Sequence, residues 1–339
     1  MFWEEDMKII SKIISIFLIC TLFVGCSKNQ QQLDNTKTKE NDKVSFLLDW
    51  TPNTNHTGIY VAIEKGFYNE VGIDLEVLNP PEESTTALVA AGKADFGVSF
   101  QDTMGMAINE NDNFPIVAVA TIIQHNTSGI LSLKEKGIDS FKNLEGKIYA
   151  TWDNALEQAT IKQVMENEGG DFEKVELYHS SVTDAVSAIQ TNVDAVWVYE
   201  AWDTMMAKVS GVDYNFIKFK DVEPALDFYT PVIVSSEKYL AENEDIAKRF
   251  LQATKKGYEY AIENPEESAQ ILYKYVPEYD LNMLIESQKY LANEYKAEVS
   301  QWGYIDKERW NNFYNWAYEK GLITKDLTDK GFTNDYLPQ

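Results

Sequence analysis

The stretch Leu48-Asp49-Trp50-Thr51-Pro52-Asn53-Thr54-Asn55-His56-Thr57-Gly58 organises the rest of the chain. The apolar run at residues 44–48 predicts a buried strand, and residues 59–66 predict a short helix that ends at a glycine. The turn between them carries an indole ring, amides and an imidazole. In an open α/β sheet such turns lie at the carboxyl ends of the strands, where ligands bind. We therefore predict a binding turn, against the alternative of a polar connection that holds a buried tryptophan.

The chain after this turn alternates strands and helices, which predicts an α/β fold with a mostly parallel sheet. The expected elements of the first part are strand 44–48, helix 57–65, strand 74–78, helix 85–91, strand 96–98, helix 104–108 and strand 115–121. The same order recurs in strand 147–150, helix 156–167, strand 175–178, helix 183–190, strand 195–198 and helix 204–209. In this repeat Trp152 matches Trp50, Asp194 matches Asp95, and Glu200 matches Gln101. We therefore expect two similar lobes whose strand-end loops face one another.

Two segments are candidates for the crossings between these lobes, one near residues 124–129 and one near residues 226–231. Two crossings return the chain to the first lobe, so we predict lobe 1 over residues 44–126 and 230–339, and lobe 2 over residues 127–229. A strand at 232–234 follows the second crossing, and the remainder is predicted to be almost entirely helical. The expected helices of this C-terminal extension are 237–242, 245–264, 265–275, 281–296 and 307–320.

The composition excludes several classes of function. A chain of 339 residues can form two domains with real cores, and its net charge of −24 argues against binding to nucleic acid or to an anionic lipid surface. Both cysteines, Cys20 and Cys26, lie near the N-terminus, so the folded part has no cysteine for a disulfide or a metal site. His56, His125 and His179 lack the spacing of zinc ligands, and we predict no metal site.

The N-terminus is predicted to be a targeting segment. Residues 1–6 are acidic, the wrong charge for the start of a signal peptide, so we expect translation to begin at Met7. The apolar run at 13–24 ends in Leu22-Phe23-Val24-Gly25-Cys26, which resembles the cleavage motif of bacterial lipoproteins, with Phe23 as a departure. The resemblance implies a signal peptide over residues 1–25, lipid on Cys26 and a flexible tether over residues 26–43. The alternative is an ordinary signal peptide or a short anchor.

The strand-end segments 49–58, 99–104, 151–158, 198–204 and 227–231 have an unusual composition. They are rich in aromatic rings, carboxylates and amides, and they contain no lysine and no arginine. A site for sulfonate, phosphate or nitrate normally has a cation. Aromatic walls with carboxylates suit a flat, nitrogen-rich ring with N–H donors, such as an aminopyrimidine. The chain shows no nucleophile elbow, no phosphate loop and no metal cluster, so we predict a binding protein and no enzyme.

The motif at 48–58 resembles the opening motif of solute-binding proteins of ABC importers for the pyrimidine precursor of thiamin. Gly66-Phe67-Tyr68, Ala91-Gly92-Lys93-Ala94-Asp95-Phe96-Gly97-Val98 and Tyr229-Thr230-Pro231-Val232-Ile233 also resemble this family. The resemblance implies a two-lobed periplasmic-binding fold of type II that closes on its ligand and delivers it to a membrane permease. The best-known ligand of the family is a formylated aminomethyl-pyrimidine, and riboflavin or another flat heterocycle is the alternative.

The resemblance also implies roles for particular residues. Trp50 and Tyr229 would contact the ring, and Glu200 would accept a hydrogen bond from the pyrimidine amine. Asn53 or Asn55 would bind from the first lobe, with Asn154 and Glu157 from the second. The complete predicted set of ligand-binding residues is Asp49, Trp50, Asn53, Asn55, His56, Gln101, Asp102, Trp152, Asn154, Glu157, Glu200, Trp202 and Tyr229.

The same superfamily contains a eukaryotic pyrimidine synthase, so the alternative function for this chain is that of an enzyme. That enzyme has a lysine and a histidine in the segment that matches residues 99–103, together with a cysteine-rich iron motif. Here Ser99 and Thr103 occupy those places, and no cysteine follows Cys26. We therefore expect no synthase activity and no cofactor. We expect a monomer on the outer face of the bacterial cytoplasmic membrane, anchored through Cys26, whose partners are the ligand and an ABC permease.

Overall fold

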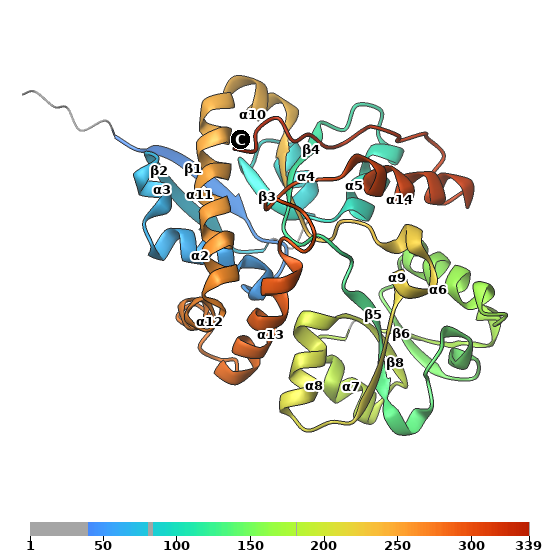
Figure 1. Cartoon of the computed structure of the whole chain (residues 1–339). Helices are drawn as coiled ribbons and strands as arrows, with labels where there is room; N and C mark the ends of the chain where they lie inside the picture. Colours follow the sequence, from blue (N-terminus) through green and yellow to red (C-terminus); the bar gives the residue numbers. More distant parts are fainter. Residues whose placement is uncertain (1–39, 81–83, 181, 339) are drawn as a thin grey trace, which may run out of the picture. The chain divides into compact units, whose positions relative to one another are not determined.

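The computed structural model describes residues 40–80, 84–180 and 182–338 (Figure 1). The predictions for the signal peptide, the start at Met7, the lipid on Cys26 and most of the tether lie outside these residues. Within the described ranges, no helix combines the length and the apolar character that a membrane crossing requires.

The first lobe is built on a five-stranded sheet in the order β2-β1-β3-β10-β4. The strands β1, β2 and β3 are parallel, and β10 runs antiparallel to both β3 and β4. The strand bounds are β1 Asp42–Leu47, β2 Ile73–Leu78, β3 Phe96–Ser99, β4 Ile116–Thr121 and β10 Val232–Ser236. The helices that connect these strands are α2 Thr57–Glu64, α3 Phe67–Glu70, α4 Thr85–Ala90 and α5 Gln101–Glu110.

The second lobe repeats this arrangement in the order β7-β6-β8-β5-β9, in which β5 is the antiparallel strand. Its strands are β5 Ser128–Leu133, β6 Ile148–Thr151, β7 Glu176–His179, β8 Ala195–Tyr199 and β9 Tyr214–Lys218. Its helices are α6 Ala155–Asn167, α7 Ala185–Thr191, α8 Met205–Val209 and α9 Phe219–Val222, with a π-helix over Glu200–Thr204. The predicted alternation is thus correct for both sheets, and each sheet has one antiparallel strand.

Matching hydrogen bonds support the repeat that the sequence predicts. Asp95 accepts from the backbone N–H of Ser45 in β1 at 2.8 Å, and Asp194 accepts from the backbone N–H of Ile148 in β6 at 2.9 Å. Each aspartate therefore ties the loop before one strand to the neighbouring parallel strand. The same role at the same place in both sheets explains why the two loops share an aspartate.

The sequence analysis missed two strands, β5 and β9, and placed the start of β1 too late. Strand β5 follows the first crossing directly, so it overlaps the segment that was predicted as that crossing. The half-buried strand β9 pairs only with β5, at the edge of the sheet. Strand β1 begins at Asp42 instead of residue 44, because the Asp42 N–H donates to Gly72 O at 2.9 Å.

The C-terminal helices are α10 Glu237–Glu242, α11 Glu244–Glu263, α12 Pro265–Tyr273, α13 Leu281–Glu294 and α14 Lys307–Glu319. The long helix α11 lies beside α2 of the first lobe (Figure 1). The two helices touch at glycines, because a Cβ on Gly257 would lie 2.0 Å from Gly58 O and a Cβ on Gly58 would lie 2.3 Å from the Tyr258 ring. This close approach holds α11 directly behind the turn at residues 48–58.

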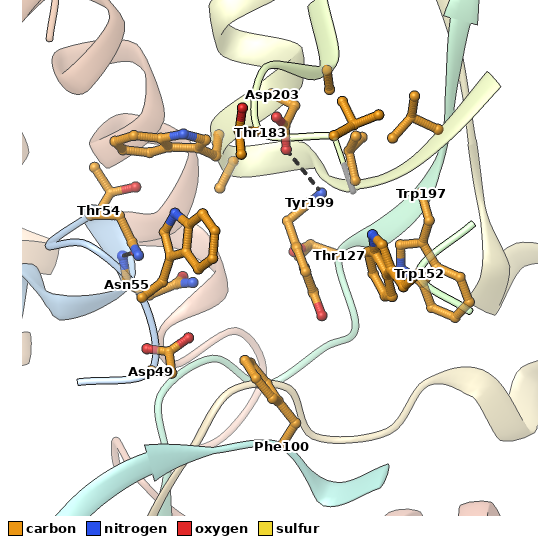
Figure 2. Close-up of a pocket in the computed structure, with 18 residues that line it drawn as sticks. Asp49, Thr54, Asn55, Phe100, Thr127, Trp152, Thr183, Trp197, Tyr199 and Asp203 are labelled. Carbon is orange, nitrogen blue, oxygen red and sulfur yellow. Dashed lines mark hydrogen bonds between the residues drawn. The ribbon is translucent and has the colours of Figure 1, made fainter. Parts of the chain in front are cut away.

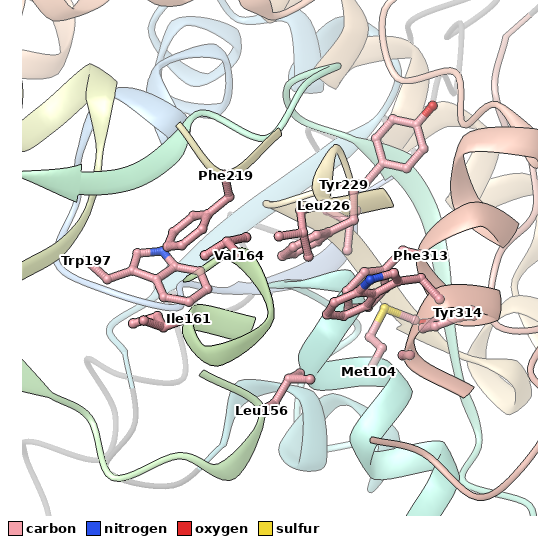
Figure 3. Close-up of a cluster of buried hydrophobic side chains, with 14 of the residues drawn as sticks. Met104, Leu156, Ile161, Val164, Trp197, Phe219, Leu226, Tyr229, Phe313 and Tyr314 are labelled. Atoms are coloured by element: carbon pink, nitrogen blue, oxygen red, sulfur yellow. The ribbon is translucent and has the colours of Figure 1, made fainter. Parts of the chain in front are cut away.

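An apolar cluster continues from one lobe to the other through the second crossing (Figure 3). Trp197 and Phe219 of the second lobe pack together with ring centroids 4.0 Å apart. Phe228 of the crossing packs against Phe313 of α14 at 4.3 Å. The crossing is therefore seated in hydrophobic side chains of both lobes.

Substitution of Gly257 by alanine tests the contact between α2 and α11. Alanine normally favours a helix, but here its Cβ would overlap Gly58 O, so we expect the free energy of unfolding to fall by about 1–3 kcal/mol. Urea unfolding of the purified protein measures this change. Gln252→Ala, on the exposed face of the same helix, is the control and should be neutral. A Gly257→Ala protein as stable as the control would show that the helices can separate without cost.

Candidate functional site

A pocket of about 310 Å³ lies between strand-end segments of the two sheets (Figure 2). This volume is at the lower end of the range for small-molecule sites. Its lining from the first lobe is Asp49, Trp50, Asn53, Thr54, Asn55 and Phe100. Its lining from the second lobe is Thr127, Trp152, Val182, Thr183, Ala185, Val196, Trp197, Val198, Tyr199, Ala201, Trp202 and Asp203. Most of these residues lie at or just beyond the carboxyl ends of strands, where the sequence placed the site.

The turn after β1 forms the wall of the first lobe and is held by its own polar groups. Asn53 caps the single 3₁₀ turn at Thr54–His56, where its side chain accepts from the Asn55 N–H at 2.9 Å and donates to Thr51 O at 3.1 Å. Trp50 is 55% exposed, although it is a large apolar side chain. An exposed indole on a rigid turn is available to contact a ligand.

The C-terminal helices fasten this turn from behind. The Tyr258 hydroxyl of α11 donates to Asn55 O at 2.7 Å, and the Tyr295 hydroxyl just after α13 donates to Thr54 O at 2.6 Å. The Thr54 hydroxyl also pairs with the Ser287 hydroxyl of α13 at 2.6 Å. The helical extension therefore fixes the backbone of the binding turn.

Aromatic side chains form much of the wall of the second lobe. Trp152, just after β6, is 43% exposed, and its ring lies 5.4 Å from that of Trp197. Trp202 lies in the π-helix after β8 and packs edge-on against Tyr279 at 4.9 Å. Because Trp50 and Trp152 follow equivalent strands of the two sheets, each lobe presents one partly exposed indole to the pocket.

The charge of the pocket is entirely negative. Asp49 and Asp203 are its charged lining residues, and no lysine or arginine is among them. Burial raises the pKa of Asp203 to about 6, because the Tyr199 N–H at 3.4 Å offsets little of the desolvation. Such a site favours a neutral or cationic ligand with N–H donors over an anion.

Several predicted site residues line this pocket, namely Asp49, Trp50, Asn53, Asn55, Trp152 and Trp202. The sequence analysis did not select Phe100, Tyr199, Trp197 or Asp203. Tyr199 and Asp203 lie in the strand-end segment 198–204 that it singled out, so the signal was present. The sequence alone could not show which side chains of that segment face inward.

Gln101 and Tyr229 are buried and lie outside the pocket lining, so their contact with a ligand stays a prediction. The Gln101 side chain donates to Trp310 O at 2.7 Å and accepts from the Tyr229 N–H at 2.9 Å. The Tyr229 hydroxyl accepts from the Asp306 N–H at 2.8 Å. Both residues secure the second crossing to the C-terminal helices.

Asn154 and Glu157 also turn away from the pocket. Asn154 caps α6, where it accepts from the Leu156 N–H at 2.8 Å. The buried Glu157 carboxylate accepts from the Tyr149 hydroxyl at 2.5 Å and the Thr151 hydroxyl at 2.9 Å, and it also accepts the Trp152 N–H. The two residues thus hold the turn that carries Trp152, and they lie outside the pocket lining.

Asp102, His56 and Glu200 complete the predicted residues outside the lining. Burial raises the pKa of Asp102, whose carboxylate accepts from the Thr103 N–H at 2.7 Å. His56 is buried behind Asp49. Glu200 accepts from the Tyr290 hydroxyl at 2.5 Å and forms an ion pair with Lys218 at 2.7 Å. With these partners Glu200 lies outside the pocket lining, and its role as the acceptor for a pyrimidine amine stays a prediction.

Charged side chains link the two crossings to the helical extension. The Asp227 carboxylate accepts from the Asn126 N–H at 3.0 Å and pairs with His125 Nδ1 at 2.7 Å. Glu298 pairs with His125 Nε2 at 2.9 Å and with Arg309 at 2.6 Å.

Among the described residues, no group of histidine, cysteine and acidic side chains is suited to hold a metal ion.

The pH dependence of stability tests this linkage. The hydrogen bond to Asp227 is the main cause that raises the pKa of His125, so the folded state favours the imidazolium. This stabilisation is complete below the ordinary pKa of 6.5 and is lost as the pH rises through the raised folded pKa. We expect His125→Gln to lower the free energy of unfolding more at about pH 5.5 than at about pH 9. The difference should be on the order of 1 kcal/mol or less, because solvent screens the pair.

Urea unfolding of both proteins at the two pH values measures this difference. An equal loss of stability at both would contradict a charged His125 in the folded state.

The chain is similar to known proteins in sequence and in fold. The model of a family described as NMT1/THI5 like matches residues 53–268. The chain is 28% identical over 312 residues to a formylaminopyrimidine-binding protein of Halalkalibacterium halodurans, with 90% of this chain and 92% of the relative covered. It is 24% identical over 320 residues to the 4-amino-5-hydroxymethyl-2-methylpyrimidine phosphate synthase THI11 of Saccharomyces cerevisiae, covering 87% of this chain and 88% of that protein.

Among solved structures, the alkanesulfonate-binding protein SsuA of Xanthomonas axonopodis pv. citri bound to MOPS has a TM-score of 0.66 at 12% identity. The match covers 87% of this chain and 99% of that protein. An identity this low speaks for the fold alone, and it confirms the predicted two-lobed periplasmic-binding fold of type II.

Proposed function

Because the chain belongs to the NMT1/THI5 like family, we propose that it is an extracytoplasmic binding protein for a pyrimidine precursor of thiamin. Its ligand would be of the formylaminopyrimidine type, which the relative from Halalkalibacterium halodurans binds according to its name. The observation that carries the proposal is a pocket between two lobes that is lined by indoles and carboxylates and by no cation.

The aromatic walls suit a flat ring. Trp50 and Trp152 are partly exposed, although burial in the core would be the favourable place for such large apolar side chains. Stacking on a heterocycle when the lobes close would cover them. A base stacked on an aromatic side chain gains about 1–3 kcal/mol, enough to make these two rings major determinants of affinity.

The polar lining suits amines and disfavours phosphate. Asp49 and Asp203 offer acceptors for N–H groups, and the amides of Asn53 and Asn55 can both donate and accept. A phosphate group would bring its charge beside carboxylates without a lysine or arginine to pair with it. The proposed ligand is therefore an unphosphorylated pyrimidine, unlike the phosphate in the name of the yeast synthase.

Catalysis by this chain finds little support in its side chains. Ser99 and Thr103 occupy the segment where the synthase is expected to have lysine and histidine. The Ser99 hydroxyl is buried and pairs with the Thr86 hydroxyl at 2.6 Å, and neither Ser99 nor Thr103 lines the pocket. We therefore propose that the protein binds its ligand and does not transform it.

The same proposal covers delivery and location. The protein would be a monomer on the outer face of the bacterial cytoplasmic membrane, held by lipid on Cys26 and the tether after it, and would pass its ligand to an ABC permease. Its lobes, with boundaries at 126/127 and 229/230, would close about the two crossings.

Titration calorimetry on the purified full-length protein in detergent tests the ligand. Formylaminopyrimidine should bind one to one, and a phosphorylated aminopyrimidine should bind at least about tenfold more weakly, which corresponds to about 1.4 kcal/mol. Thiamin and riboflavin complete the series. Binding of riboflavin and of no pyrimidine would overturn the proposed ligand but leave the binding role. Equal affinity for the phosphate ester would contradict the proposed effect of the pocket's negative charge. Turnover of the pyrimidine would indicate an enzyme.

Removal of an indole tests the walls. Trp152→Ala should weaken pyrimidine binding by about 1–3 kcal/mol through lost stacking, measured by the same titration. Tyr318 is 50% exposed and lies outside the pocket, so Tyr318→Ala is the matched control and should bind like the wild type. Unchanged affinity in the folded Trp152→Ala protein would remove this ring from the binding site.

A further inference from the structure

A chain of hydrogen bonds runs from the backbone through a buried imidazole to a carboxylate of the pocket. The Asn53 N–H lies 3.2 Å from His56 Nδ1, and His56 Nε2 lies 2.8 Å from Asp49 Oδ1. His56 is fully buried, whereas Asp49 keeps 14% of its side chain exposed and lines the pocket. The histidine therefore touches the carboxylate but lies outside the lining.

The backbone determines which nitrogen of His56 carries the proton. An amide N–H can only donate, so Nδ1 must be the acceptor and must lack a proton. The neutral ring then carries its proton on Nε2 and donates it to Asp49. A proton on Nδ1 would instead face the Asn53 N–H. The turn thus selects one tautomer, and that tautomer directs a donor at the carboxylate.

This hydrogen bond orients the Asp49 carboxylate and gives its two oxygens different roles. Oδ1 receives the imidazole, while Oδ2 has no hydrogen-bond partner in the described part of the chain. A carboxylate held through one oxygen cannot rotate freely, so the other oxygen keeps a fixed direction as an acceptor. Because the carboxylate has lost its rotational freedom before a ligand arrives, binding carries a smaller entropy cost.

We propose that His56 is a positioning residue that orients Asp49, and that Asp49 accepts the exocyclic N–H of the ligand. The inference rests on the proposed function and deepens it, because it assigns the amine-recognising group to the first lobe and not to Glu200. Glu200 already binds Lys218 and Tyr290, whereas Asp49 forms no ion pair with a lysine or arginine of the described residues.

Asp203 is the other carboxylate of the pocket and is held less firmly. The structure gives it one hydrogen bond, from the Tyr199 N–H at 3.4 Å, close to the longest distance for such a bond. Asp49 has a short, direct bond to a buried donor on a turn that α11 and α13 fasten. Of the two, Asp49 is the better defined acceptor.

The test compares two ligands on variants of the full-length protein in detergent. The ligands are formylaminopyrimidine and its analogue with hydrogen in place of the exocyclic amine. Their affinity ratio in calorimetry is the amine preference, which a merely structural role for His56 would not change. A hydrogen bond to a charged group is worth about 1.5–3 kcal/mol, so we expect a preference of roughly 10–150-fold in the wild type.

His56→Leu should reduce this preference toward one and leave the affinity for the analogue nearly unchanged. His56→Gln retains one acceptor and one donor on a planar group and should restore much of the preference. Asp49→Asn should lose it. Tyr318→Ala, on the exposed surface outside the pocket, should behave like the wild type.

A full amine preference in a folded His56→Leu protein would overturn the positioning role. If that variant does not fold, Asp49→Asn decides, because an undiminished preference there would overturn the assignment of the amine to Asp49. Failure of the wild type to bind either ligand would instead count against the proposed function.

Discussion

The close contact between Gly58 of α2 and Gly257 of α11 is the constraint on which the binding turn depends. A Cβ on either residue would collide with the opposite helix, so only glycine lets the two helices lie this near. The approach brings Tyr258 within hydrogen-bond distance of the turn, and α13 adds Ser287 behind it. A helical extension far along the sequence thereby sets the backbone from which Asp49, Trp50 and Asn53 project.

The repeated architecture explains how one pocket acquires matching walls. The equivalent strands β1 and β6 each end in a turn that carries a partly exposed tryptophan, and each turn is braced by a buried polar side chain of its own lobe. His56 braces the first turn through Asp49, and Glu157 braces the second through the Trp152 N–H. In our account the indoles supply stacking, the carboxylates select N–H donors, and the ion pairs at the crossings connect the lobes.

Much of this organisation could be predicted from the sequence, because alternation of apolar segments and capping residues reports local structure directly. The turn at residues 48–58 and the repeat that pairs Trp50 with Trp152 are examples. The direction of individual side chains could not be predicted. Glu200 and Asp203 lie in one π-helix, yet only Asp203 lines the pocket. Likewise the sequence could not show that the Glu157 carboxylate accepts from three groups of its own lobe.

The most direct measurement is a crystal structure of the protein with formylaminopyrimidine. We predict that the pyrimidine ring lies against Trp50 and Trp152, with its exocyclic amine on Asp49 and no ion pair to the protein. A ligand bound elsewhere, or an amine held by Glu200 after release of Lys218 and Tyr290, would contradict it.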